Sequence, residues 1–166
     1  MDKLLTVVIP SYKSRRRIIS HISKLPKKLN IIVIENSEDI YLKELIDKKF
    51  KNTEIYLKKN IGYGRAINFA AKKVKTKYFF VMNPDTTIYD RTLKNLIVAG
   101  EKINTFGMLS PEHTSNKRFH MSKDNIVEKK ALTGGAMFFN TKIFKKIKGF
   151  DENIFLYYED NDYYTK

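Results

Sequence analysis

The sequence predicts an α/β protein in which helices flank a mostly parallel sheet. Short apolar, β-branched runs alternate with segments whose apolar residues recur at helical spacing, and proline, glycine or polar corners separate them. The chain has 166 residues, of which 42% are hydrophobic, and it carries no low-complexity linker. That length is sufficient for one domain with its own core. We therefore expect a single doubly wound domain over residues 1–166.

The first part of the chain predicts three strands and two helices. The run from Leu4 to Ile9 is apolar throughout and stops at Pro10, as a strand buried on both faces does. Apolar residues then recur at helical spacing between Ser14, the expected N-cap, and Pro26. The elements expected next are a strand at 31–34, a helix at 40–50 and a strand at 54–57.

The remaining elements follow a glycine loop at 60–64. A helix with small buried residues is expected from Ala66 to Val74, followed by a strand at 78–82 and a helix at 92–103. The stretch 111–128 is polar and is interpreted as a loop or a weak hairpin. The stretch 131–139 is apolar around two glycines, and a short helix at 141–148 ends at Gly149.

Polar corners follow the expected strands. Because the carboxyl ends of parallel strands meet at one edge of a sheet, these corners predict one pocket there. Each corner taken alone is more typical of an ordinary turn. The corners are Pro10-Ser11-Tyr12, Glu35-Asn36-Ser37, the loop containing Gly62 and Gly64, and Asn83-Pro84-Asp85.

Two other enzyme classes fit these corners poorly. The glycine loop lacks the third glycine of a dinucleotide-binding fingerprint and follows the wrong strand. A helix that begins there still favours an anion such as a diphosphate, with Arg65 as a cationic fork. The segment from Asn83 to Thr87 is similar to the Asp-x-Asp-x-Thr pattern of aspartyl phosphatases, but Asn83 has no carboxylate to act as the nucleophile.

Five sequence blocks, in order, resemble the family-two inverting glycosyltransferases, particularly their rhamnosyltransferase-like branch. The resemblance covers nearly the whole chain and implies a GT-A fold that binds a nucleotide sugar. The blocks are Val8–Tyr12, Glu35–Ser37, Asn60–Asn68, Asn83–Thr86, and Gly149–Glu152 leading to Glu159–Asp162.

The resemblance also implies a role for individual residues. Asp85 matches the last acid of the family's Asp-x-Asp element and is expected to hold Mg²⁺ or Mn²⁺ on the donor diphosphate, while Asn83 replaces the first acid. Asp160 matches the catalytic base. Glu35, which is expected to face the nucleotide base, stands where aspartate is more usual. The expected nucleotide-sugar-binding set is Pro10, Ser11, Tyr12, Glu35, Asn36, Gly62, Gly64, Arg65, Asn68, Asn83, Asp85, Gly134 and Gly135.

Three further expectations concern the segment around the expected base. Gly134 and Gly135 either let the backbone approach the sugar closely or form a strand kink. The run Phe155–Tyr158 is expected to pack beneath the site, mostly as core. Asp162 either orients an acceptor or faces solvent near a helix start. Because the family normally continues beyond the acidic motif, the chain is interpreted as lacking a C-terminal extension, and weak or absent transfer activity is expected of it.

Composition narrows the partners and the location. The chain has no cysteine, which excludes disulfides and thiol catalysis. No apolar stretch is long enough to span a bilayer, so a cytoplasmic protein is expected. The net charge of +14 predicts attraction to polyanions. The resemblance further implies a UDP- or dTDP-sugar donor and a saccharide or lipid-linked acceptor in cell-surface polysaccharide synthesis. The positive charge, together with a lipid-linked acceptor, predicts an anionic membrane at the inner face of the plasma membrane as a further partner. The alternative is a non-catalytic basic module that binds membrane or nucleic acid, although the ordered motifs make nucleic acid the less favoured ligand.

Overall fold

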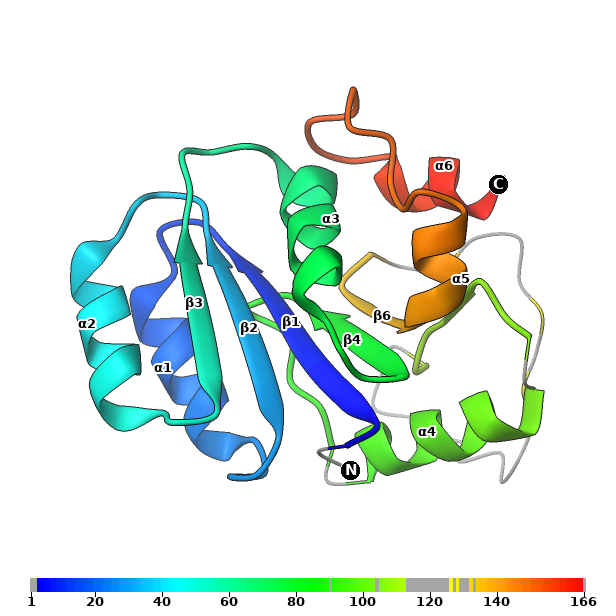
Figure 1. The fold of residues 1–166 in the computed structure, drawn as a ribbon, viewed down its shortest axis with the longest axis horizontal. Helices are drawn as coiled ribbons and strands as arrows, with labels where there is room; N and C mark the ends of the chain where they lie inside the picture. Colours follow the sequence, from blue (N-terminus) through cyan, green and yellow to red (C-terminus); the bar gives the residue numbers. More distant parts are fainter. Residues whose placement is uncertain are drawn as a thin grey trace.

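The fold comes from a computed structural model, which describes residues 3–89, 91–103, 105–112 and 134–165 together with positions 126, 128 and 132. Within these residues, six strands form one sheet in the order β3-β2-β1-β4-β6-β5 (Figure 1). The strands are β1 (Leu5–Ser11), β2 (Asn30–Glu35), β3 (Thr53–Leu57), β4 (Tyr78–Met82), β5 (Met108–Leu109) and β6 (Ala136–Asn140).

Helices cover both faces of this sheet. They are α1 (Arg15–Lys24), α2 (Ile40–Lys49), α3 (Tyr63–Lys73), α4 (Thr92–Ile103), α5 (Thr141–Lys146) and α6 (Glu159–Tyr164). The α/β class with a mostly parallel sheet is thereby confirmed, because β1, β2, β3 and β4 pair in parallel.

Two hydrophobic cores lie on opposite faces of the sheet, because successive side chains of the central strands alternate between the faces. In β1, Val7 and Ile9 pack toward α1, α2 and α4, whereas Val8 packs toward α3, α5 and α6. Successive side chains of a strand point to opposite faces, so a strand covered on both sides must be apolar throughout. All seven residues of β1 are accordingly buried.

Strand β6, which lies between β4 and the short edge strand β5, runs antiparallel to β4. Its register pairs Met82 with Ala136, so the chain that precedes β6 enters at the carboxyl end of β4. Gly134 and Gly135 therefore lie at the carboxyl ends of the parallel strands, beside the corners that follow β1, β2 and β4. We call this end of the sheet the rim. The sequence locates this glycine pair but carries no signal for the reversed strand.

The element boundaries differ from expectation in a few places. Helix α3 begins at Tyr63, three residues before the expected start, and β1 continues through Pro10 to Ser11. Ser14 occupies the N-cap position of α1 without a capping hydrogen bond, because its hydroxyl donates to the Tyr12 carbonyl instead. The short strand β5 was not expected. Most of the stretch 111–128, interpreted as a loop or hairpin, lies outside the described residues.

Candidate functional site

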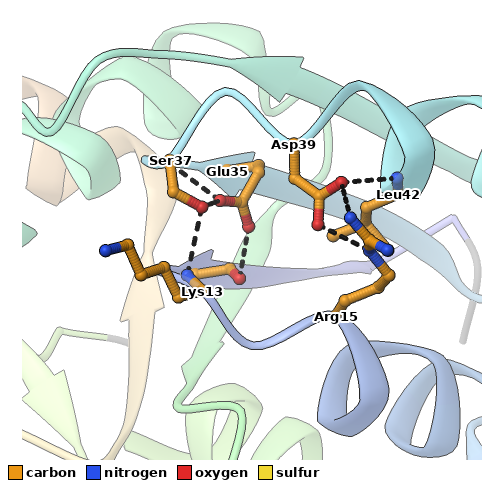
Figure 2. A network of polar contacts seen from close by, with 7 residues as sticks. Lys13, Arg15, Glu35, Ser37, Asp39 and Leu42 are labelled. Carbon is orange, nitrogen blue, oxygen red and sulfur yellow. Dashed lines mark hydrogen bonds and ion pairs between the residues drawn. The ribbon is translucent and has the colours of Figure 1, made fainter.

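The corner between β1 and β2 is organised around the buried carboxylate of Glu35. Ser11 Oγ donates to Glu35 Oε2 at 2.6 Å, and the Ser37 backbone N–H donates to Glu35 Oε1 at 2.8 Å (Figure 2). The Ser37 hydroxyl also donates to Oε1. Both carboxylate oxygens of Glu35 accept hydrogen bonds from protein groups, so Glu35 connects the corner after β1 to the corner after β2. This is the position expected to face the nucleotide base.

An ion pair between Arg15 and Asp39 lies next to this corner, nearer to solvent. Arg15 donates to both oxygens of Asp39 at 2.7 Å, in the fork geometry that guanidinium and carboxylate groups favour (Figure 2). Asp39 also accepts from Leu42 N at 3.0 Å and so caps α2. The hydrogen bond from Arg15 is the main reason that the pKa of Asp39 is lowered. Helices α1 and α2 are therefore fixed to each other at the rim.

Asn36 joins the β2 corner to the glycine loop. Its Nδ2 donates to the Gly62 carbonyl at 3.3 Å, and its backbone N–H donates to the Ser11 carbonyl at 2.8 Å. The side chain is buried, and within the described part of the chain its Oδ1 accepts no hydrogen bond. Asn36 therefore holds the β2 corner, the end of β1 and the glycine loop together.

Gly62 is required by both its conformation and its surroundings. Its φ of +88° lies in the left-handed region, and an added Cβ would lie 2.4 Å from the Phe155 carbonyl oxygen. The same carbonyl accepts from Tyr63 N at 3.0 Å, which satisfies one of the free N–H groups at the start of α3. The glycine loop is thus packed against the chain that leads to Asp160.

Tyr63 lies at the centre of the rim, although it is not among the residues expected to bind the nucleotide sugar. Its hydroxyl oxygen lies 2.7 Å from Asn83 Oδ1 and 2.7 Å from the Gly134 carbonyl oxygen. Burial, with a smaller contribution from the nearby carboxylates of Glu159, Asp160 and Asp85, raises the pKa of this phenol. Tyr63 therefore stays protonated and links α3, the end of β4 and the segment before β6.

The segment after β4 is a tight turn that presents Asp85 to solvent. Thr86 N donates to the Asn83 carbonyl at 3.0 Å, which closes the turn. Thr86 Oγ1 and Asn83 N donate to the Gly135 carbonyl at 3.0 Å and 3.1 Å. The segment Asn83-Pro84-Asp85 therefore does form an ordinary turn, as its sequence alone suggests. The same turn holds Asp85, which is exposed, beside the glycine pair.

The chemistry of this turn fits a divalent cation bound mainly through its substrate. Oxygen ligands suit Mg²⁺ and Mn²⁺, and Mg²⁺ on nucleotides typically uses one or two carboxylates plus phosphate oxygens. Asp85 supplies such a carboxylate. Among the residues described, no three acidic or histidine side chains are placed so that together they could hold a metal ion.

Asp160 lies across the rim, in the first turn of α6. Its Oδ2 lies 3.0 Å from where a Cβ on Gly134 would be, so a larger residue at position 134 would displace this carboxylate. Oδ1 accepts from Asn161 N at 2.9 Å. The neighbouring Glu159 is only 5% exposed, and burial raises its pKa. Glu159 is a second residue that the sequence interpretation did not select.

Asn68 and Arg65 are engaged with protein groups in the segment 150–152. Asn68 Nδ2 donates to the Phe150 carbonyl at 2.9 Å, and its Oδ1 accepts from Phe150 N at 3.0 Å. Arg65 Nε donates to the Glu152 carbonyl. Both were expected to bind the nucleotide sugar, but these bonds give them a clear role in holding the chain that carries Asp160.

The aromatic run before Asp160 was wrongly expected to be core. Its members are exposed, with 72% of Tyr157 and 74% of Tyr158 accessible to solvent. Tyr157 and Tyr158 also adopt left-handed backbone, with φ of 64° and 69°. That conformation is unfavourable for non-glycine residues and turns the chain abruptly into α6, which keeps these side chains out of the core.

Pro10 is buried at the rim, and Tyr12 is exposed beside it.

Comparison with known proteins agrees with this geometry. The model of the family described as Glycosyl transferase family 2 matches residues 6–157. No curated protein sequence matches the chain significantly. Among the residues described, no helix is long and apolar enough to cross a membrane.

Several solved structures share the fold. Residues 1–349 of S. aureus TarS align with a TM-score of 0.72 and 18% identity, over 97% of this chain and 54% of that one. A Pyrobaculum calidifontis mannosyltransferase, PcManGT, in complex with GDP-Man and Mn²⁺, gives 0.72 and 15%, over 96% and 50%. GalNAc-T7 with UDP, GalNAc and Mn²⁺ gives 0.72 and 15%, over 97% and 40%.

The chain spans about half the length of the first two of these structures. At this level of identity the structures establish the fold alone. The family match covers most of the chain, and the fold, the glycine loop and the rim corners agree with it. The chain belongs to glycosyl transferase family 2 and has the GT-A fold of a glycosyltransferase.

Proposed function

We propose that this domain transfers a sugar, with inversion, from a UDP- or dTDP-sugar to a hydroxyl of a saccharide or lipid-linked acceptor in cell-surface polysaccharide synthesis. The observation that carries the proposal is the convergence of the Asn83–Thr86 turn, Tyr63, Gly134 and Asp160 at one rim. Structures of similar fold contain UDP-GlcNAc, or GDP-Man with Mn²⁺, which supports a nucleotide-sugar donor.

The donor is proposed to lie along the carboxyl ends of the strands. Pro10, Ser11 and Tyr12 line the nucleotide pocket, and Asn36 holds the glycine loop beside it through the Gly62 carbonyl. Glu35 fixes that corner through Ser11 and Ser37. Gly62, Gly64 and the α3 N-terminus approach the diphosphate. Arg65 and Asn68 contribute by holding the segment 150–152.

Asp85 is proposed to hold the divalent cation, Mg²⁺ or Mn²⁺. When bound, the cation neutralises the negative charge that develops on the departing diphosphate. Asn83, whose Oδ1 lies 2.7 Å from the Tyr63 hydroxyl, keeps the turn in place. Gly134 and Gly135, which have no side chain, leave room for the sugar between the turn and Asp160.

Asp160 is proposed to act as the general base. Its carboxylate takes the proton from the acceptor hydroxyl as that oxygen forms a bond to the anomeric carbon. The bond from the anomeric carbon to the phosphate oxygen breaks on the opposite side, and its electron pair leaves with the nucleoside diphosphate. Attack from the side opposite the leaving group inverts the configuration.

The charge of +14 supports a reaction at the cytoplasmic face of an anionic membrane, where lipid-linked acceptors lie. The non-catalytic basic module is the less favoured function, because a charged surface alone does not require the interlocked rim around Tyr63 and Glu35.

Calorimetric titration with UDP-, dTDP- and GDP-sugars, with and without Mn²⁺, tests the proposed function. The expected result is saturable binding of one nucleotide class that requires the cation. Binding that ignores Mn²⁺ and weakens steeply with salt for every polyanion would instead identify a basic module.

A further inference from the structure

The opposite edge of the sheet carries a cavity that the transfer reaction does not use. The cavity is open to solvent and has a volume of about 550 Å³. It lies at the amino ends of the parallel strands, because Lys3 precedes β1, Asn30 begins β2 and Thr76 precedes β4. The lining residues are Lys3, Lys28, Asn30, Asn52, Lys75 and Thr76.

The charge around this cavity has one sign. Three lysines line it: Lys3 from the segment before β1, Lys28 from the α1–β2 connection and Lys75 from the α3–β4 connection. None of its described lining residues is acidic, and within the described part of the chain the ion pairs do not involve these lysines. Three ammonium groups without carboxylate partners give the cavity a positive potential, which favours an anion there.

Hydrogen bonds fix the walls in advance. Thr76 Oγ1 lies 2.8 Å from Thr6 Oγ1 and donates to the Tyr78 carbonyl at 2.8 Å. Asn52 Nδ2 donates to the Lys27 carbonyl, and Asn52 O accepts from Ile31 N at 3.0 Å. The backbone that presents the lysines is therefore tied to the sheet, and less of it must be ordered when a ligand binds.

We propose that this cavity is a second anion site, which takes a phosphate-bearing ligand and is separate from the donor rim. Phosphate groups carry up to two charges and several acceptor oxygens, which matches three lysines that together offer nine donor hydrogens. The volume is larger than one phosphate group requires, so the ligand is a phosphorylated small molecule or the headgroup of an anionic lipid.

Titration of the ¹⁵N-labelled domain with pyrophosphate, without divalent cations, tests this site by NMR. The expected result is a saturable shift of the backbone amides of Asn30, Asn52 and Thr76, with the rim amides unchanged. The triple variant Lys3→Gln, Lys28→Gln, Lys75→Gln is expected to bind about tenfold more weakly or worse, because each lysine contributes to attraction near the site.

The matched control is Lys94→Gln, Lys102→Gln, Lys146→Gln, which removes the same charge from exposed positions outside the cavity. Equal weakening in both triple variants, or shifts confined to the rim, would overturn the proposal. If the first triple variant does not fold, Lys75→Gln alone serves, with an expected loss of about threefold against Lys94→Gln.

Sedimentation with phosphatidic acid vesicles separates the two ligand sources. If vesicle binding falls in the cavity variant but not in the control, the ligand is a lipid headgroup. If vesicle binding is equal in both while pyrophosphate binding differs, the ligand is a soluble phosphate compound. Pyrophosphate binding that is equal in both variants contradicts the site whatever the vesicles do.

Discussion

At the residue scale, the proposed sugar transfer depends on Asp160, which accepts the proton of the acceptor hydroxyl. We expect Asp160→Asn to reduce the release of nucleoside diphosphate in the presence of acceptor by about 10²- to 10⁴-fold, because an amide cannot serve as a general base. The donor dissociation constant, measured by calorimetry, is expected to stay nearly unchanged. Asp47→Asn, which alters an exposed carboxylate paired with Lys43, is the matched control. Equal turnover in the wild type and Asp160→Asn would exclude this role.

Tyr63 provides a second test, since it connects three segments of the rim. We expect Tyr63→Phe to lower the free energy of unfolding by about 1–2 kcal/mol, because the hydrogen bonding of its hydroxyl to partly buried partners is lost. Donor binding is expected to weaken as well. Tyr56→Phe removes an exposed hydroxyl bonded to Glu54 and is the control. Urea denaturation of both variants measures the difference, and identical losses would argue against a special role for Tyr63.

Glu159 predicts a pH dependence of stability. Burial raises the pKa of this carboxyl, so the folded protein binds the proton more tightly than the unfolded chain does. Its contribution to the free energy of unfolding is therefore expected to fall as pH rises from the unfolded pKa through the folded one. Glu159→Gln removes this term, so thermal melting of the two proteins from pH 4 to 7 should diverge in favour of the variant. A constant difference across that range would contradict the prediction.

At the element scale, the sequence was informative about which elements form and less so about what their ends contact. Apolar runs and helical spacing predicted β1 to β4 and the helices α1 to α5, because local periodicity encodes them, but they gave no signal for α6. The contacts of Asn68 with Phe150 span 82 residues, and no local pattern encodes such a pairing. The run Phe155–Tyr158 was misread for a related reason, since its composition suggests a core but its backbone turns it outward.

The cap of α2 offers a test at this scale. Asp39 both caps the helix and accepts two hydrogen bonds from Arg15. We expect Asp39→Ala to cost about 1 kcal/mol through loss of the cap, whereas Asp39→Asn retains a capping oxygen and costs less. Because the pKa of Asp39 is lowered in the folded state, its contribution is present at neutral pH and is lost as pH falls through that pKa. Urea denaturation at pH 7 and pH 3 measures both effects, and equal losses for the two variants would contradict the role of the cap.

At the scale of the whole molecule, the two ends of the parallel strands carry side chains of opposite charge, and we propose a different ligand for each. The carboxyl end gathers Asp85, Glu159 and Asp160 around Tyr63. The amino end gathers lysines around a cavity. The sequence revealed the net charge of +14 but not this division, because the lysines come from separate connections that only the fold brings together.

The most direct measurement is calorimetric titration of the preferred nucleotide sugar into the wild type and Asp85→Asn at a fixed Mn²⁺ concentration, with Asp47→Asn as the control. We expect cation-dependent binding by the wild type and the control. Binding to Asp85→Asn should be at least about tenfold weaker, because the carboxylate that we propose to hold the cation has been neutralised. Equal, cation-dependent binding by Asp85→Asn and the wild type would contradict the proposed site.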